Sequence, residues 1–210
     1  MSGNIVLVGD SIFDNAPYVP DEPCVTEQLQ SIVRDGVDVS MLAVDGDYIK
    51  DVQLQLIDLP DQASHVFVSA GGNDALSYSQ KLDTEYLTSM ELFAEWSVIQ
   101  KEFRQNYRAM LTAVMALGRH TAVCTIYDAV PGIEAEKITA LSLFNDVITG
   151  EAVFAGLPVV DLRWVCTESS DYSPLSPIEP SNKGGAKIAA ALNRVFEEHD
   201  FDTSHTSVYT

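Results

Sequence analysis

Near its N-terminus the chain reads Asn4-Ile5-Val6-Leu7-Val8-Gly9-Asp10-Ser11. Four consecutive apolar residues that end at a Gly-Asp-Ser turn are typical of a fully buried strand. In an open α/β sheet, ligands bind beyond the carboxyl ends of the strands, so Ser11 is expected where chemistry would occur. The tripeptide alone favours a tight turn in which Ser11 only caps a helix. The rest of the chain has to decide between these two interpretations.

Strand-like and helix-like segments alternate along the chain. Apolar runs predict further strands at 37–44, 65–70, 121–127 and 157–162, and apolar spacings of three and four residues predict helices near 23–35, 52–59, 92–117, 141–152 and 182–198. This alternation predicts an α/β protein whose parallel sheet is covered by helices on both faces. We expect five strands in the order 2-1-3-4-5, which brings Ser11, Gly46 and Asn73 to one crevice.

Length and composition predict one domain. No linker-like stretch divides the 210 residues, so we expect a single domain over residues 1–198 and a polar C-terminal tail over 199–210. No apolar run approaches the roughly 18 to 20 residues that a membrane helix needs, and the expected first strand leaves no room for a leader before Asn4. We therefore expect no membrane insertion and a cytoplasmic protein.

The strongly acidic composition excludes some classes of partner. The chain has 31 Asp and Glu against 12 Lys and Arg, a formal net charge of −19, which repels phosphate backbones and anionic lipids. Nucleic acid is therefore not an expected partner. Three cysteines, at 24, 124 and 166, are an odd number without metal-ligand spacing and are expected to be reduced. We expect no metal site.

Motifs at three expected strand ends supply the groups that acyl transfer requires. These motifs are Gly9-Asp10-Ser11, Asp45-Gly46 and Gly71-Gly72-Asn73-Asp74. A serine hydroxyl can attack a carbonyl, and the developing oxyanion needs preorganised donors about 3 Å away. The Ser11 N–H, the Gly46 N–H and the Asn73 amide are the candidate donors. Each motif alone also suits a turn, but their order and positions together are more specific.

On these three blocks, the chain resembles the SGNH (GDSL-type) hydrolase family from Val6 to about Leu192. In this family the nucleophilic serine, the glycine after the second strand and the asparagine are matched by Ser11, Gly46 and Asn73. The resemblance implies a flavodoxin-like three-layer α/β/α fold and hydrolysis of carboxylic esters, from small acyl esters to lipid-like ones. It implies a small-molecule ester substrate and no cofactor.

The fourth block of the family is altered in this chain. Family members have Asp-x-x-His followed by Pro-Ser, whereas alignment on Pro180-Ser181 puts Glu179 at the histidine position and Ser176 at the aspartate position. A carboxylate is a weaker base than imidazole by about two pKa units, roughly 3 kcal/mol, although burial can raise its pKa toward 6 or 7. A glutamate needs no partner to set a tautomer. Glu179 is therefore the candidate base, and Asp171 is a candidate assistant.

An alternative interpretation leaves Ser11 without a base. Glu179 lies near the expected start of the last helix, where the helix dipole favours negative charge whatever the residue's function. Under that interpretation the chain is a catalytically impaired SGNH-fold pseudoenzyme that binds a ligand or a protein. The four histidines, at 65, 120, 199 and 205, do not occupy a matching position.

Overall fold

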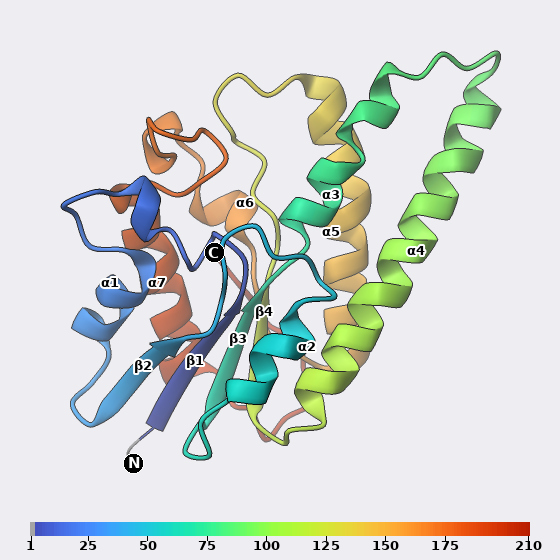
Figure 1. The fold of residues 1–210 in the computed structure, drawn as a ribbon. Coiled ribbons are helices and arrows are strands. Elements are labelled where there is room, and N and C mark those ends of the chain that lie inside the picture. The colour runs from blue at the N-terminus through green and yellow to red at the C-terminus, as the bar shows by residue number, and fades with distance from the viewer. Residues whose placement is uncertain (1–2) are drawn as a thin grey trace.

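A six-stranded parallel sheet runs through the computed structural model, which describes residues 3–210 (Figure 1). Its spatial order is β2-β1-β3-β4-β5-β6. The strands are β1 (Gly3–Gly9), β2 (Val37–Met41), β3 (His65–Ser69), β4 (His120–Cys124), β5 (Val159–Val160) and β6 (Val208–Tyr209). β1 pairs with both β2 and β3, so the strand that leads to Ser11 lies inside the sheet.

Helices cover both faces of this sheet (Figure 1). They are α1 (Val25–Ile32), α2 (Val52–Gln55), α3 (Gly72–Ser77), α4 (Ser89–Met115), α5 (Ala135–Ala155), α6 (Leu162–Val165) and α7 (Asn182–Glu198), with 3-10 turns η1 (Ala16–Tyr18), η2 (Leu56–Asp58), η3 (Ser79–Asp83) and η4 (Ser169–Asp171). α1 and α7 pack together on one face, and α4 and α5 pack together on the other. The result is a three-layer α/β/α arrangement.

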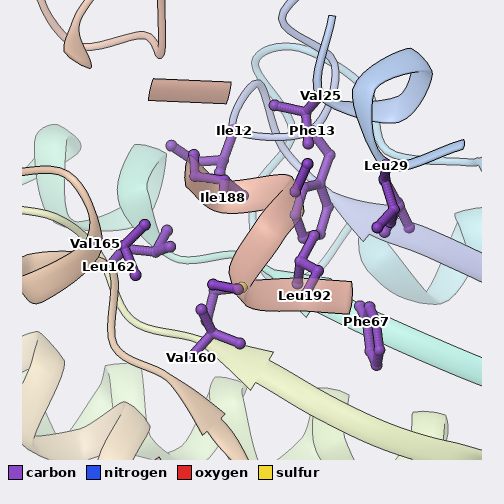
Figure 2. Close-up of a cluster of buried hydrophobic side chains, with 14 of the residues drawn as sticks. Ile12, Phe13, Val25, Leu29, Phe67, Val160, Leu162, Val165, Ile188 and Leu192 are labelled. Atoms are coloured by element: carbon purple, nitrogen blue, oxygen red, sulfur yellow. The ribbon is translucent and has the colours of Figure 1, made fainter. Parts of the chain in front are cut away.

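The alternation of side chains along β1 explains why both faces are covered. Ile5 and Leu7 belong to the core on the α1 and α7 side, whereas Val6 and Val8 belong to the core on the α4 and α5 side. All four are fully buried, and each contributes about 1.5–3 kcal/mol relative to an exposed side chain. Figure 2 shows the first of these cores, where side chains of α1 and α7 meet the sheet.

The predicted α/β class and the strand order 2-1-3-4-5 are confirmed, with one addition. The expected count of five strands is wrong because β6 follows β5 at the edge of the sheet. The segment 199–210 is therefore not merely a polar tail: Tyr209 is buried, and its carbonyl accepts a bond from the Asp161 N–H. Residues 1 and 2 of the expected domain lie outside the described residues.

The expectation that the protein does not insert into a membrane stays a prediction, and α5 is the helix that bears on it. This helix has 21 residues and is long and apolar enough, by length and composition, to cross a bilayer. Core helices of soluble proteins pass the same test, and the buried Phe144, Ile148 and Ala152 of α5 pack in the core on the α4 side. Glu151, also buried, pairs with Arg104 and Arg108 of α4, so an ion-pair cluster joins these two helices.

Candidate active site

Ser11 follows β1 directly, at the carboxyl edge of the sheet. Gly9 has φ of +128°, and a Cβ there would lie 1.7 Å from the Ser69 carbonyl oxygen, so only glycine allows this close approach. The Asp10 N–H donates to the same carbonyl at 3.0 Å. Ser11 is 7% exposed and lines a cavity of about 150 Å³. The turn therefore holds a nearly buried hydroxyl at the wall of a cavity.

Asn73 lies in the first turn of α3 and lines the same cavity. Its Nδ2 donates one hydrogen bond to the Asp47 carbonyl at 2.9 Å. Because a side-chain amide carries two N–H groups, the second is available to another acceptor. Gly71, before the helix, has φ of +115°, so the turn that places Asn73 favours glycine.

Gly46 lies beside this site without lining the cavity. It is exposed and has φ of +85°, and its chain neighbour Asp47 accepts the Asn73 bond. Among residues 3–210, the N–H groups of Ser11 and Gly46 have no hydrogen-bond acceptor. Because Ser11 lines the cavity, its N–H is free to donate to a group bound there.

Gln55 fixes the loops that carry these groups, and the sequence did not single it out. Its Oε1 accepts from the Gly9 N–H at 2.8 Å, and its Nε2 donates to the Gly9 carbonyl at 2.7 Å and to Asp47 Oδ2 at 2.8 Å. One buried side chain therefore links the turn before Ser11 to the loop that holds Gly46. No local signal marks this residue, because its partner Gly9 is 46 positions away in the chain.

Glu179 lies in the connection between η4 and α7 and lines the cavity with Ser11. The segment is fixed on both sides: the Tyr127 hydroxyl donates to the Ile178 carbonyl at 2.6 Å, and Asn15 Nδ2 donates to the Pro180 carbonyl at 3.2 Å. The Glu179 carbonyl itself accepts from the Ser173 N–H at 2.8 Å. Tyr127 and Asn15 thus hold the segment that carries Glu179, and sequence reasoning did not single out Tyr127.

The Glu179 carboxylate does not cap the following helix, α7. Glu179 is 5% exposed, and within residues 3–210 its Oε2 has no hydrogen-bond partner. The N-terminus of α7 is capped instead by Ser181, whose hydroxyl accepts from the Gly184 N–H at 3.1 Å. A buried polar atom without a partner is costly, so Oε2 is not held by a structural contact and is free to accept a proton or a hydrogen bond at the cavity.

Burial raises the pKa of Glu179 from 4.5 to about 7, because water is excluded from the ionised form. A hydrogen bond from the Ser11 hydroxyl favours the ionised carboxylate and so lowers the pKa of Glu179. The negative charge of Asp45 raises the pKa of Glu179. Burial likewise raises the pKa of Asp10 to about 7, against the hydrogen bond from the Ile12 N–H. At neutral pH, Glu179 is thus close to its own midpoint.

The raised pKa has a consequence for stability. The unfolded chain releases the Glu179 proton near pH 4.5 and the folded chain near pH 7, so the folded state binds more protons between these values. Its free energy of unfolding therefore falls as pH rises through this window, by up to about 3 kcal/mol. We expect Glu179→Gln to stabilise the protein by ~1–3 kcal/mol at pH 8 and by much less at pH 5.

Urea denaturation of the variant and the wild type at the two pH values measures this difference. Glu22→Gln, at an exposed glutamate, is the matched control and is expected to change stability by no more than about 0.5 kcal/mol. A Glu179→Gln protein that is less stable than the wild type at pH 8 would contradict the raised pKa.

Asp171 is placed away from the cavity. It is fully buried, Lys187 donates to its Oδ2 at 2.6 Å, and the Glu168 N–H donates to the same atom at 3.0 Å. Asp171 is not among the residues that line the cavity. Its contacts therefore do not support the prediction that it assists Glu179, because it pairs with the helix α7 instead.

None of the four histidines lines the cavity. His65, His120 and His199 surround Phe201, with ring centroids 5.0, 4.8 and 4.7 Å from it. Two of these histidines begin β3 and β4, so the cluster lies at the amino edge of the sheet, opposite to Ser11. His205 is exposed. Asp10 and Glu179 are the carboxylates that line the cavity with Ser11. Asp10 Oδ1 already accepts from the Ile12 N–H at 3.2 Å, whereas Glu179 Oε2 has no partner within residues 3–210.

The His, Cys, Asp and Glu side chains of residues 3–210 do not form a metal site. Within the part of the chain that the structure describes, no group of three or more His, Cys, Asp or Glu side chains is arranged to hold a metal ion. Cys24, Cys124 and Cys166 are free and buried. Burial raises the pKa of the Cys124 thiol far above its ordinary value, so this cavity-lining thiol is protonated and unreactive.

Comparisons with known proteins agree with the α/β/α fold described above. Residues 7–187 match the model of the GDSL-like lipase/acylhydrolase family. A search of curated proteins gives no match. Among solved structures, a lipase from a goat rumen metagenome is similar with a TM-score of 0.72 and 17% identity, over 95% of this chain and all of that one.

Two further solved structures have the same fold. An extracellular lipase from Streptomyces rimosus gives a TM-score of 0.67 and 17% identity, over 91% of this chain and 99% of that one. An acetyl xylan esterase from Geobacillus stearothermophilus gives a TM-score of 0.68 and 15% identity, over 95% of this chain and 98% of that one. At these identities the likeness concerns the fold alone, and it spans both chains almost completely.

Proposed function

Because the chain belongs to the GDSL-like lipase/acylhydrolase family, we propose that it hydrolyses carboxylic esters with Ser11 as nucleophile and Glu179 as general base. The observation that carries this proposal is the pairing of two groups at one cavity. Ser11 has a nearly buried hydroxyl, and Glu179 has a buried carboxylate oxygen without a partner and a pKa near neutrality. A general base works best when its pKa lies near the working pH.

The reaction begins when Ser11 Oγ bonds to the acyl carbon and its proton passes to Glu179. The carbonyl π electrons move to the oxygen, which becomes an oxyanion. The donors for that oxyanion are the unpaired N–H groups of Ser11 and Gly46 and the second amide N–H of Asn73. Expulsion of the alcohol breaks the carbon–oxygen bond and takes the proton from Glu179. An acyl-Ser11 ester remains.

The second half of the cycle uses water in place of the serine. Glu179 accepts a proton from a water molecule as the water oxygen bonds to the acyl carbon. Collapse of the intermediate returns the proton to Ser11 Oγ and releases the carboxylic acid. Gln55 holds the Gly9 turn and the Asp47 loop throughout, so the donors are placed before the charge develops. No metal or cofactor takes part in these steps.

Covalent labelling with an organophosphonate tests the proposal. Mass spectrometry of the labelled protein is expected to find the adduct on Ser11, together with loss of p-nitrophenyl ester turnover. Ser11→Ala is expected to remove both the adduct and the turnover. Ser79→Ala, at another serine that lines the cavity, is the matched control and is expected to retain labelling.

The same experiment separates the enzyme from the pseudoenzyme. A folded wild-type protein that neither reacts at Ser11 nor turns over any ester would contradict the proposal and favour a binding module. Turnover that persists in Ser11→Ala would also contradict it, because the nucleophile would then be another residue.

A further inference from the structure

The cavity at Ser11 continues into an apolar interior. Beyond the polar groups, its walls are formed by Leu82 of η3, Ile126 after β4, Trp96 of α4, and Ala140, Leu141 and Phe144 of α5. Trp96 and Phe144 are buried and meet edge to face with ring centroids 6.3 Å apart. Apart from the groups next to Ser11, Lys137 at the start of α5 is the charged residue that lines it. An uncharged, flexible group fits such walls.

The position of the proton carrier decides which part of an ester enters this interior. Glu179 comes from the segment before α7, on the α1 and α7 side of the sheet, whereas Trp96 and Phe144 come from the opposite helical layer (Figure 1). The leaving oxygen has to lie beside Glu179 to receive its proton. The acyl group, on the other side of the reacting carbon, therefore points toward Trp96 and Phe144.

We infer that the cavity binds an unbranched aliphatic acyl group of medium length, about six carbons, in preference to acetyl. This inference rests on the proposed function and adds the substrate class. A largely apolar cavity of about 150 Å³ has room for a group the size of benzene, which has six carbons. An acetyl group would leave most of the wall without contacts, and unfilled apolar space forfeits dispersion energy.

A series of p-nitrophenyl esters from acetate to dodecanoate tests the inference. Each methylene that enters the cavity is expected to raise kcat/KM about fourfold, so hexanoate is expected to exceed acetate by on the order of 100-fold. A reversed series of alkyl acetates, from ethyl to hexyl, is expected to gain far less, because its chain lies on the Glu179 side.

Two variants of adjacent α5 residues locate the effect. Ala140→Phe fills the cavity and is expected to lower the ratio of hexanoate to acetate turnover at least tenfold. Thr139→Phe introduces the same side chain at an exposed neighbour that does not line the cavity and is expected to keep the wild-type ratio. Acetate as the best wild-type substrate, or equal ratios in the two variants, would overturn the inference.

A binding measurement tests the cavity independently of hydrolysis. In a Trp164→Phe background, Trp96 is the sole remaining tryptophan, and 1-hexanol is expected to change its fluorescence at a concentration at which ethanol does not. The absence of that change would overturn the inference. If hexanol binds and no ester is hydrolysed, the proposed function fails while the apolar binding site stands.

Discussion

Glu179→Gln is expected to lower kcat/KM for esters by on the order of 10³- to 10⁴-fold. Glutamine has the shape of glutamate and keeps the packing of a side chain that is 5% exposed. It has no carboxylate to accept the Ser11 proton, so attack would have to proceed with the weakly nucleophilic neutral hydroxyl. The fall is expected in kcat, because Glu179 acts on the reacting atoms and not on the acyl chain.

Comparison with Glu168→Gln separates the loss of a base from the loss of a charge. Glu168 is an exposed carboxylate in the segment that leads to α7, where it pairs with Lys183, and its replacement is expected to leave kcat/KM within about twofold of the wild type. The increase in stability expected for Glu179→Gln at pH 8 shows that the protein is folded. Activity of Glu179→Gln within a few-fold of the wild type would rule out Glu179 as the base.

Asn73→Ala is expected to lower kcat by about 10²- to 10³-fold, with a small change in KM. One Nδ2 hydrogen holds the Asp47 carbonyl at 2.9 Å, and the other is the proposed donor to the oxyanion. Because the oxyanion carries its full charge only in the transition state, this donor stabilises that state more than the bound ester. Steady-state kinetics on the hexanoate ester measure the two constants separately.

Ser77→Ala is the matched control for this change, since Ser77 lies on the same helix and is exposed. It is expected to leave both kinetic constants unchanged. A rise in KM with an unaltered kcat in Asn73→Ala would contradict the oxyanion role, because it would show that Asn73 binds substrate and transition state equally.

The parts of the fold that sequence predicts well are those with strong local signals. β1 is a continuous apolar run, and α4 repeats its apolar residues every three or four positions up to Val114. β6 has no such signal: it has two residues, Val208 and Tyr209, and forms by pairing with β5. Its stability comes from a partner strand far away in the sequence, so a local pattern does not reveal it.

In the candidate site, too, sequence predicts the residues that lie in local motifs and misses those that depend on contacts between distant segments. The motifs at Ser11, Gly46 and Asn73 are read from short stretches because each has a turn with glycine at positive φ or close approach. Gln55 and Tyr127 reach the candidate site only through hydrogen bonds with Gly9 and Ile178, which are remote from them in the chain. The cavity and its chain-length preference also require the assembled helices α4 and α5.

The identity of the base shows where sequence and structure complement each other. A glutamate with its ordinary pKa of 4.5 would be a weaker base than the histidine that it replaces. Burial beside Ser11 raises that pKa to about 7, close to the roughly 6.5 of imidazole. The same burial that makes Glu179 costly to the folded state thus makes it suitable as a base at neutral pH.

The pH dependence of phosphonate labelling at Ser11 tests this central claim most directly, because it follows attack by the nucleophile without later steps. The wild-type rate is expected to rise with pH as Glu179 ionises near pH 7. In Glu179→Gln the rate is expected to be far lower and to lack that ionisation. A Glu179→Gln profile that keeps both the wild-type rate and the transition near pH 7 would contradict the account.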